Sequence, residues 1–517
     1  MTRISATFFR ALLVCVPCSL AAACGPVTDQ PPDGTLIVAV LGDARSLDPH
    51  MVTDAASMRM IENMYSTLLR YGDDYENMQL GLDLAESIDI SDDYLIYTIT
   101  LVPNATFHNG RPVSAEDVQY SIQRIRDQGV RAGQFSSIES IETPDDHTVV
   151  LRLSRPEAAL ETYLAHPMNA IVDVEVVQNN NGSLQNVDAG SGPYKLVEWQ
   201  RGQHLRLLRH NSYHVIQRPI METVIFRPLA DETARSTAIR TGEVHIVHEV
   251  PNKDRDILDQ ADGVRIVSVP GTFWEYIGLN CTRPPLDQAR MRQAIAWAID
   301  REQLNRAIKF GQATVLTGGH IPPNHWAHAD LDTYPQPERE MARRLLADAG
   351  YADGIELEMV VDSSIDYQVR AAEMVKQQLA AVGINVNLRG LEPGVFYDRL
   401  NNREFDSTLV GWLGFVDPDE WVADLFHTDG RFNQQGYSNE SVDALIEEAA
   451  RIHDRGQRKE LYRRVQERIT LDAPMVFLYV NPHTTAIREN VTGYRVHPTG
   501  TTLSVRDAQV HKTPVKQ

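Results

Sequence analysis

The sequence predicts an α/β protein of more than one domain, from its length and from the hydrophobic pattern of its C-terminal half. The chain has 517 residues, and at about 150 residues per domain two to four domains are expected. Short apolar runs at 355–361 and 384–388 flank a helical pattern that begins at Asp366 and ends at Gly383. Strands that alternate with helices of this length are typical of a parallel or mixed α/β sheet. Further strands are predicted at 407–411 and 475–480, and helices at 337–350, 394–401, 439–453 and 456–471.

The N-terminal half shows more strands and fewer helices. An apolar strand is predicted at 35–41 and a helix at 58–69, and another helix begins after the capping residue Ser114. A polar run at 178–183 marks a surface loop that ends this region. The other elements predicted here are strands at 94–101, 148–153, 194–199, 205–208 and 224–227 and a helix at 232–240.

The segment 276–302 has the most informative pattern of the chain. Its first residues, 276–280, form a short apolar run that predicts a buried strand, and a proline-containing crossing follows at 282–286. A helix is then predicted from its N-cap Asp287, and Asp300 caps a second helix. The apolar face of the first helix consists of Met291, Ala294, Ile295, Ala298 and Ile299.

Charge excludes several classes of partner. The chain carries 49 basic and 70 acidic residues, which gives a formal net charge of −21, and it contains no long block of like charge. Nucleic acids and anionic membrane surfaces attract clustered Lys and Arg. Neither is therefore an expected partner, and the acidic residues are interpreted as a solvated surface.

Residues 1–23 are predicted to form a signal peptide. Arg3 and Arg10 provide its positive start, and an apolar stretch follows at 11–23. That stretch is shorter than the about 20 residues that a membrane-spanning helix needs. The protein is therefore expected to be exported to the periplasm or the cell surface.

Cys24 is the candidate lipidation site. The run Leu-Ala-Ala-Ala-Cys at 20–24 resembles a bacterial lipobox, in which the cysteine carries the lipid and becomes the first mature residue. Ordinary cleavage after Ala23, which leaves a free thiol, is the alternative. Residues 24–34 are interpreted as a flexible tether. Cys281 is then the one thiol of the folded body, so neither an intramolecular disulfide nor a cysteine zinc site is expected.

No catalytic residue, metal site or cofactor site is predicted. The chain contains no Gly-x-Ser-x-Gly elbow, no His-Glu-x-x-His and no phosphate-binding glycine loop. Ser191 belongs to a tight turn before Pro193. The acids at 417–420 are interpreted as loop residues that cap a helix, and not as a hydrolytic pair. The histidines of segment 320–328 have no Asp, Glu or Cys at ligand spacing.

Short motifs follow one another in a characteristic order between about residues 35 and 500. They are Ser46-Leu47-Asp48-Pro49, Phe107-His108-Asn109-Gly110 with Ala115-Glu116-Asp117-Val118, Gly190-Ser191-Gly192-Pro193-Tyr194, Thr241-Gly242-Glu243-Val244-His245, the segment 276–302, Gly411-Trp412 and Asp472-Ala473-Pro474. In this order they resemble the signature of the dipeptide/oligopeptide class (family 5) of extracellular solute-binding proteins of ABC transporters. Asn109 and His245 depart from it, since aspartate is more usual at both places.

The resemblance implies a two-lobed periplasmic-binding-protein fold, class II-like and of the large cluster with an extra N-terminal subdomain. In such a fold the ligand is buried between the lobes as they close. The two crossings between the lobes are expected near 280–283 and 481–486. The implied division is 35–71, 189–282 and 486–517 for lobe I, 72–188 for its extra subdomain and 283–485 for lobe II.

The resemblance also implies the function, that of a substrate-binding lipoprotein of an ABC importer. Such a protein captures short peptides between its closing lobes and delivers them to a permease in the inner membrane. It is expected to be a monomer that a lipid anchor holds at a membrane. Two alternatives stay open: a non-peptide solute (an oligosaccharide, an opine or a metal complex) on the same fold, and a surface sensor lipoprotein.

The candidate ligand contacts are Trp412, Phe415, Asp417, Trp274 and Tyr276. Pockets are mostly apolar and favour domain interfaces, although these rings could equally belong to the core. In peptide-binding relatives, an aspartate three residues after the tryptophan that matches Trp412 pairs with the ligand's α-ammonium. Phe415 holds that place here, in a loop that is one residue shorter. Either Asp417 takes the ammonium, or the receptor does not recognise a free N-terminus and Asp417 only caps the turn; the ring favours the second interpretation.

Overall fold

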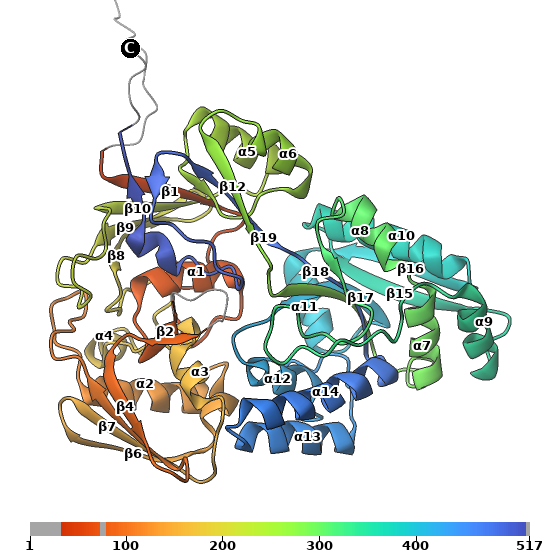
Figure 1. Ribbon diagram of the computed structural model, residues 1–517, viewed down its shortest axis with the longest axis horizontal. Helices are drawn as coiled ribbons and strands as arrows, with labels where there is room; N and C mark the ends of the chain where they lie inside the picture. The colour runs from red at the N-terminus through yellow and green to blue at the C-terminus, as the bar shows by residue number, and fades with distance from the viewer. Residues whose placement is uncertain (1–32, 73–78, 513–517) are drawn as a thin grey trace, which may run out of the picture.

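Two α/β lobes lie side by side, with lobe I and its extra subdomain on the left of Figure 1 and lobe II on the right. The computed structural model describes residues 33–72 and 79–512. The predicted signal peptide, Cys24 and most of the predicted tether lie outside these residues. The two-lobed α/β architecture predicted from the sequence is confirmed.

Lobe I is built on a seven-stranded mixed sheet with the strand order β12-β19-β11-β1-β10-β9-β8. β1 (Thr35–Val40) is parallel to both β10 (Thr223–Pro228) and β11 (Ile246–Val247), and nearly all of its residues are buried, as expected of a central parallel strand. The other elements of this sheet and its edges are β8 (Tyr194–Gln200), β9 (His204–Arg209), β12 (Val264–Val269), β19 (His483–Arg488), α5 (Glu232–Thr241), α6 (Arg255–Asp259), β20 (Val491–Thr492) and β21 (Gln509–Val510).

Helix α1 (Ala55–Met64) ends earlier than the sequence pattern predicts. Asp54 caps its start by accepting the N–H of Ser57, but residues 65–69 leave the helix. The carbonyl of Met64 accepts the N–H of Gly192 at 2.9 Å. A residue distant in sequence therefore satisfies the carbonyl at the end of the helix, and the hydrophobic spacing carries no information about that residue.

The extra subdomain of lobe I contains a four-stranded antiparallel sheet in the order β4-β5-β7-β6. A buried ion pair attaches it to the rest of the lobe: Arg124 donates to the two carboxylate oxygens of Asp48 at 2.9 and 2.6 Å. The elements between α1 and β8 are β2 (Leu69–Tyr71), β3 (Leu80–Leu82), β4 (Ala85–Ile90), β5 (Ile96–Leu101), α2 (Ala115–Gln128), β6 (Ile138–Asp145), β7 (Thr148–Leu153), α3 (Leu160–Ala165) and α4 (Val174–Asn179).

Lobe II contains a six-stranded sheet in the order β14-β18-β13-β17-β15-β16. The parallel pair β15 (Ile355–Asp362) and β16 (Ile384–Leu391), joined by α10 (Asp366–Ala380), is the alternation that the sequence predicts. The other elements of this lobe are β13 (Phe273–Leu279), α7 (Ala289–Ala298), α8 (Arg301–Ile308), β14 (Thr314–Val315), α9 (Arg339–Asp348), α11 (Pro393–Asn401), β17 (Ser407–Leu413), α12 (Val422–Phe426), α13 (Glu440–Arg451), α14 (Arg455–Asp472) and β18 (Met475–Val480).

The first crossing between the lobes has to be moved from its predicted place. β13 pairs with β17 and β18, so it belongs to the sheet of lobe II. The chain therefore crosses at 270–272, before Phe273, and not near 280–283. An apolar run identifies a strand, but it does not say which sheet the strand joins. The second crossing, at 481–482, joins β18 to β19.

A single buried carboxylate connects the two crossings. Glu275, which is fully buried in β13, accepts hydrogen bonds from Lys309 Nζ at 2.6 Å and from Asn481 Nδ2 at 2.8 Å. Asn481 is itself part of the second crossing. Since an unpaired charge in a protein interior costs several kcal/mol, this set of partners holds the two crossings side by side.

The main hydrophobic cluster is continuous across both lobes. It fills one side of the lobe I sheet and the extra subdomain, and it extends to the face of the lobe II sheet that carries Trp274 and Tyr276. A second cluster covers the opposite face of that sheet, with residues of α7, α8, α9 and α10. Because apolar side chains of both lobes belong to one buried cluster, the structure represents a state in which the lobes are packed against each other.

Gly192→Ala is expected to lower the free energy of unfolding by about 1–3 kcal/mol, the usual cost of overpacking. A methyl group at this position would lie 2.5–2.8 Å from backbone atoms of Met64 and Tyr65. Urea denaturation measures the loss. Gly133→Ala is the matched control, because nothing lies within 4 Å of its added carbon. Equal losses in the two variants would contradict this account.

Candidate functional site

The two lobes meet where the extra subdomain approaches α12, α13 and α14, at the lower centre of Figure 1. Tyr163 donates its hydroxyl to Asp419 Oδ2 at 2.7 Å, and Tyr71 donates to Glu420 Oε1 at 3.2 Å. A backbone bond of 2.7 Å joins the N–H of Ala158 to the carbonyl of Ala450. We call this contact region the lobe junction.

Phe415 lies in the lobe junction. Its ring meets that of His166 edge-on with 4.8 Å between centroids, and the guanidinium carbon of Arg131 lies 6.0 Å from its centre. Both of these partners belong to the extra subdomain. Burial lowers the pKa of His166 well below its ordinary value, so the imidazole is neutral. Phe415 is 5% exposed.

Asp417 is already paired within lobe II. Arg458 of α14 donates to its two carboxylate oxygens at 2.7 and 2.6 Å, and both side chains are buried. Asp417 also accepts the N–H of Asp419 and so caps the 3-10 turn at 418–420. The interpretation of these acids as capping residues is confirmed for Asp417. A ligand ammonium at this place would have to compete with a bidentate, charge-assisted pair.

Trp274, Tyr276 and Trp412 lie on one face of the lobe II sheet, because Trp274 is opposite Trp412 in the β13–β17 pair. Trp274 and Tyr276 are buried, with 4.9 Å between their ring centroids, and His320 covers Trp274. Trp412 keeps part of its surface accessible, 5.2 Å from the ring of Phe432. Of the three rings, only that of Trp412 is partly accessible.

β17 leaves a backbone edge open next to Trp412. β15 pairs with β17 only at Ser407 and Thr408. Beyond Thr408, β17 pairs with β13 on one side, and on the other side residues 409–413 form no strand pairing with the described residues. An open strand edge of this kind can pair with an extended chain.

Carboxyl groups gather at the lobe junction, and burial keeps several of them neutral. Burial raises the pKa of Glu420 and of Glu157 to about 8, and that of Asp424 to about 6. Glu420 Oε2 also accepts the N–H groups of Val416 and Asp417 at 3.0 Å each. At neutral pH the junction therefore carries less negative charge than its composition suggests.

Sequence reasoning missed the residues that lobe I contributes to the junction. Arg131, His166, Tyr71 and Tyr163 meet lobe II residues that are separated from them by more than two hundred positions in the sequence. Neither spacing nor composition predicts such a pairing. The acids of 417–420 gave a signal, but it indicated a cap and did not indicate the contact with lobe I.

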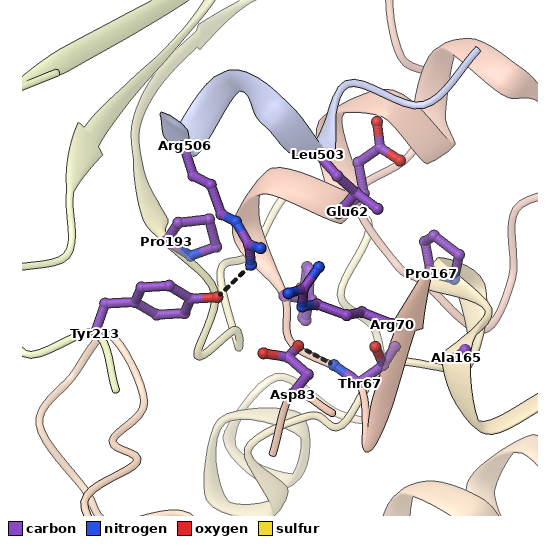
Figure 2. Close-up of a pocket in the computed structure, with 11 residues that line it drawn as sticks. Glu62, Thr67, Arg70, Asp83, Ala165, Pro167, Pro193, Tyr213, Leu503 and Arg506 are labelled. Carbon is purple, nitrogen blue, oxygen red and sulfur yellow. Dashed lines mark hydrogen bonds between the residues drawn. The ribbon is translucent and has the colours of Figure 1, made fainter. Parts of the chain in front are cut away.

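A small cavity lies in lobe I, between residues of α1, β2 and the segment that carries Arg506 (Figure 2). Its lining includes Glu62, Arg70, Asp83, Tyr213 and Arg506. The space open to the centre of a water molecule measures about 20 Å³, enough for one water. Glu62 Oε2 has no hydrogen-bond partner there among the described residues, and burial raises its pKa to about 7. The cavity is too small for a peptide.

Residues 33–72 and 79–512 contain neither a cluster of metal ligands nor a membrane-spanning helix. No group of three His, Cys, Asp or Glu side chains in this part of the chain is arranged to hold a metal ion. None of its helices combines the length and the apolarity that crossing a bilayer requires.

Two α/β lobes joined by two adjacent crossings, with buried side chains of both lobes in contact, define a periplasmic binding protein. The family follows from comparison of the sequence. The chain belongs to the bacterial extracellular solute-binding proteins, family 5, whose model matches residues 79–434. It is thus a solute-binding protein of ABC transporters and not an enzyme.

Individual relatives agree with this assignment over nearly the whole chain. The glutathione-binding protein GsiB of Pectobacterium atrosepticum is 28% identical over 488 residues, 92% of this chain and 94% of the relative; GsiB of Escherichia coli is 27% identical with the same coverage. Among solved structures, DppA of Helicobacter pylori in complex with the peptide STSA has a TM-score of 0.84 at 25% identity and covers 92% of this chain and 98% of its own. AgaA of A. tumefaciens R10 in complex with agropinic acid has a TM-score of 0.85 at 26% identity and covers 93% and 99%.

Glu420→Gln is expected to reduce the loss of stability that accompanies a rise in pH. A carboxyl group whose folded pKa is raised, here to about 8, stabilises the fold fully below its unfolded pKa of about 4.5 and loses that effect as the pH rises through the folded value. Between pH 7 and 8 the wild type should lose on the order of 1 kcal/mol through this residue. Urea denaturation at pH 7, 8 and 9 measures the slope. The exposed Glu448→Gln is the control, and identical slopes in wild type and Glu420→Gln would show that Glu420 does not contribute.

Proposed function

We propose that this protein captures short peptides between its two lobes and delivers them to an ABC permease. The observation that carries the proposal is the open edge of β17 at 409–413 beside the accessible ring of Trp412. An extended peptide that pairs with such an edge gains main-chain hydrogen bonds, while its side chains enter neighbouring pockets. Relatives named for glutathione and for a bound tetrapeptide support the same class of solute.

Non-peptide solutes are the second candidate, because AgaA, which shares this fold at 26% identity, holds agropinic acid. An opine of that kind would use the same interlobe position but not the open edge of β17. The third candidate is a surface sensor, in which binding of the same solute serves signalling instead of transport. Genes for a permease and an ATPase next to this one would favour transport over sensing.

We further propose that the receptor does not recognise a free N-terminus through Asp417. Arg458 already engages both oxygens of that carboxylate, and the ring of Phe415 occupies the place where peptide-binding relatives carry an acid. A ligand ammonium at this place would contact Asp417, which Arg458 already neutralises, and the ring of Phe415. Removing the Asp417 charge would also strand Arg458, at a cost of about 3–5 kcal/mol, so ligand variants test this point better than Asp417 variants do.

A mixed library of di- to pentapeptides is expected to raise the melting temperature of the purified protein. A ligand that binds only the native state stabilises it by about 2.7 kcal/mol at a hundredfold excess over Kd. N-acetylation of a peptide that binds should then change the affinity measured by calorimetry by less than about tenfold.

The peptide proposal and the proposal about the free N-terminus would each be contradicted by a different outcome. If opines or oligosaccharides raise the melting temperature and no peptide does, the peptide proposal is wrong and a non-peptide solute takes its place. A cost of more than about 2 kcal/mol on N-acetylation, the scale of a lost charge-assisted hydrogen bond, would show that a free N-terminus is recognised.

We also propose that Cys24 is lipidated and holds the protein at a membrane. The lipobox-like run at 20–24 supports this, followed by the tether-like segment at 24–34. Cys24→Ser is expected to move the protein from the membrane fraction to the soluble fraction, because two acyl chains anchor a protein stably whereas one binds only marginally. Fractionation of cells that express either form measures this. Equal release of wild type and variant would exclude the anchor.

A further inference from the structure

The lobe junction buries several carboxyl groups but few cations. Its buried acids are Glu157 of the extra subdomain and Asp417, Asp419 and Glu420 of lobe II. Two buried arginines of the described residues face these acids. Arg458 engages both oxygens of Asp417, whereas Arg131 donates to the sulfur of Met168 and forms no ion pair with the described residues. The junction therefore holds one close ion pair and three further acids.

Glu157 and Glu420 lie between the lobes without a close cation. Glu157 Oε1 has no hydrogen-bond partner among the described residues, and the ion pair of this acid with the partly exposed Arg155 is long, at 3.9 Å. Glu420 Oε1 lies 3.2 Å from the hydroxyl of Tyr71 in lobe I, which is an uncharged partner. A buried carboxylate without a paired charge is costly, so such a group tends to take up a proton.

Titratable and charged groups of both lobes face these two acids. Around Glu420 they are Tyr71 and Arg131 from the lobe I side, Asp417 from its own turn, and the neutral imidazoles of His166 and His497 beyond Tyr71. Around Glu157 they are Arg155 of the same segment and Asp417, Asp419 and Arg458 of lobe II. Burial outweighs the attraction of the arginines and raises the pKa of both acids to about 8. While the lobes are packed together, both acids are therefore mostly protonated at pH 7.

We propose that closure of the two lobes takes up protons at the lobe junction, so that the protein releases its solute more readily as the pH rises. The inference rests on the proposed binding of a solute between the lobes and adds a regulator of that binding. Its geometric basis is that each acid is covered by the opposite lobe. Tyr71 of lobe I lies against Glu420, and Asp419 of lobe II faces Glu157. Separation of the lobes lets water reach both acids.

The direction of the pH effect follows from the two states. With the lobes apart, a hydrated glutamate has its ordinary pKa of about 4.5 and is ionised at pH 7. With the lobes packed together its pKa is about 8, so closing the lobes at pH 7 binds a proton. The contribution of such an acid to closure is complete below about pH 4.5 and is lost as the pH rises through about 8. The affinity for the solute falls over the same range.

The competing account keeps the acids protonated in both states. In it, lobe II alone excludes water from Glu420, whose Oε2 accepts the N–H groups of Val416 and Asp417 of its own loop. The stability of the fold then depends on pH, but the binding of a solute does not change the number of bound protons. Proton uptake on binding therefore separates the two accounts.

The test counts protons by calorimetry with one peptide that binds, in phosphate, HEPES and imidazole buffers at pH 7. The slope of the observed enthalpy against the ionisation enthalpy of the buffer gives the number of protons taken up. Wild type and the exposed control Glu448→Gln are expected to take up about one proton more than Glu420→Gln, because glutamine mimics the protonated acid. The titration of the peptide itself is the same in all three proteins and cancels in the comparison.

Affinities at two pH values give the same quantity independently. From pH 6 to pH 7 the affinity of wild type should fall by up to about tenfold relative to that of Glu420→Gln, the change that one proton produces. Glu157→Gln should act in the same direction, which preserves the test if Glu420→Gln folds poorly. Equal proton uptake in wild type and in both variants would overturn the inference.

A second arm, used if no peptide binds, keeps the inference separate from the peptide proposal. X-ray scattering of the protein without added solute gives its radius of gyration at pH 6 and pH 9. If the radius increases with pH in wild type and less in the double variant Glu157→Gln/Glu420→Gln, proton-linked closure stands and the peptide proposal fails. If a peptide binds without a difference in proton uptake between wild type and the variants, proton-linked closure is excluded and the peptide proposal stands. Failure of every peptide to bind, together with a radius that does not change with pH, would overturn both.

Discussion

One buried carboxylate links the strand that follows the first crossing to a residue of the second crossing. Glu275 is placed by β13 just after the first crossing, and Asn481 of the second crossing donates to it, as does Lys309 of lobe II. Lys309 in turn lies 3.9 Å from the ring centre of Tyr367, so its charge is compensated on two sides. This set of contacts keeps the two crossings adjacent, and rotation about that region is the relative motion expected of two lobes joined in this way. The lobe junction lies away from that region, where rotation changes the separation of the lobes most.

Charges at the lobe junction are distributed unequally between the two lobes. On the lobe II side Asp417 is neutralised by Arg458, and Glu420 is held largely protonated by burial. On the lobe I side Arg131 lacks an oxygen acceptor among the described residues. At neutral pH these two acids of lobe II therefore contribute little negative charge to the junction.

The fold leaves the identity of the solute open. Solved structures that share it at 25–26% identity hold a tetrapeptide, a nonapeptide and agropinic acid. Backbone architecture is common to all of them, so the choice of solute depends on a small number of side chains between the lobes. In this chain the side chains that we propose for this role are Trp412, which is partly accessible, and Phe415, which lies against His166 and Arg131.

The sequence by itself determined the local elements and the family. The alternation of β15, α10 and β16, and the cap of α8, where Asp300 Oδ1 accepts the N–H of Gln303 at 2.8 Å, follow from periodicity and from residue preferences over a few positions. The ordered motifs likewise identified the family and the two lobes.

Only the tertiary structure decided what depends on contacts between distant residues. It assigned β13 to lobe II, buried Trp274 and Tyr276 in the core, paired Asp417 with Arg458 and brought Arg131 to Phe415. A local pattern records which residues are apolar or charged, but which of them become partners is set by the packing of the whole chain, and it was therefore not available from the sequence.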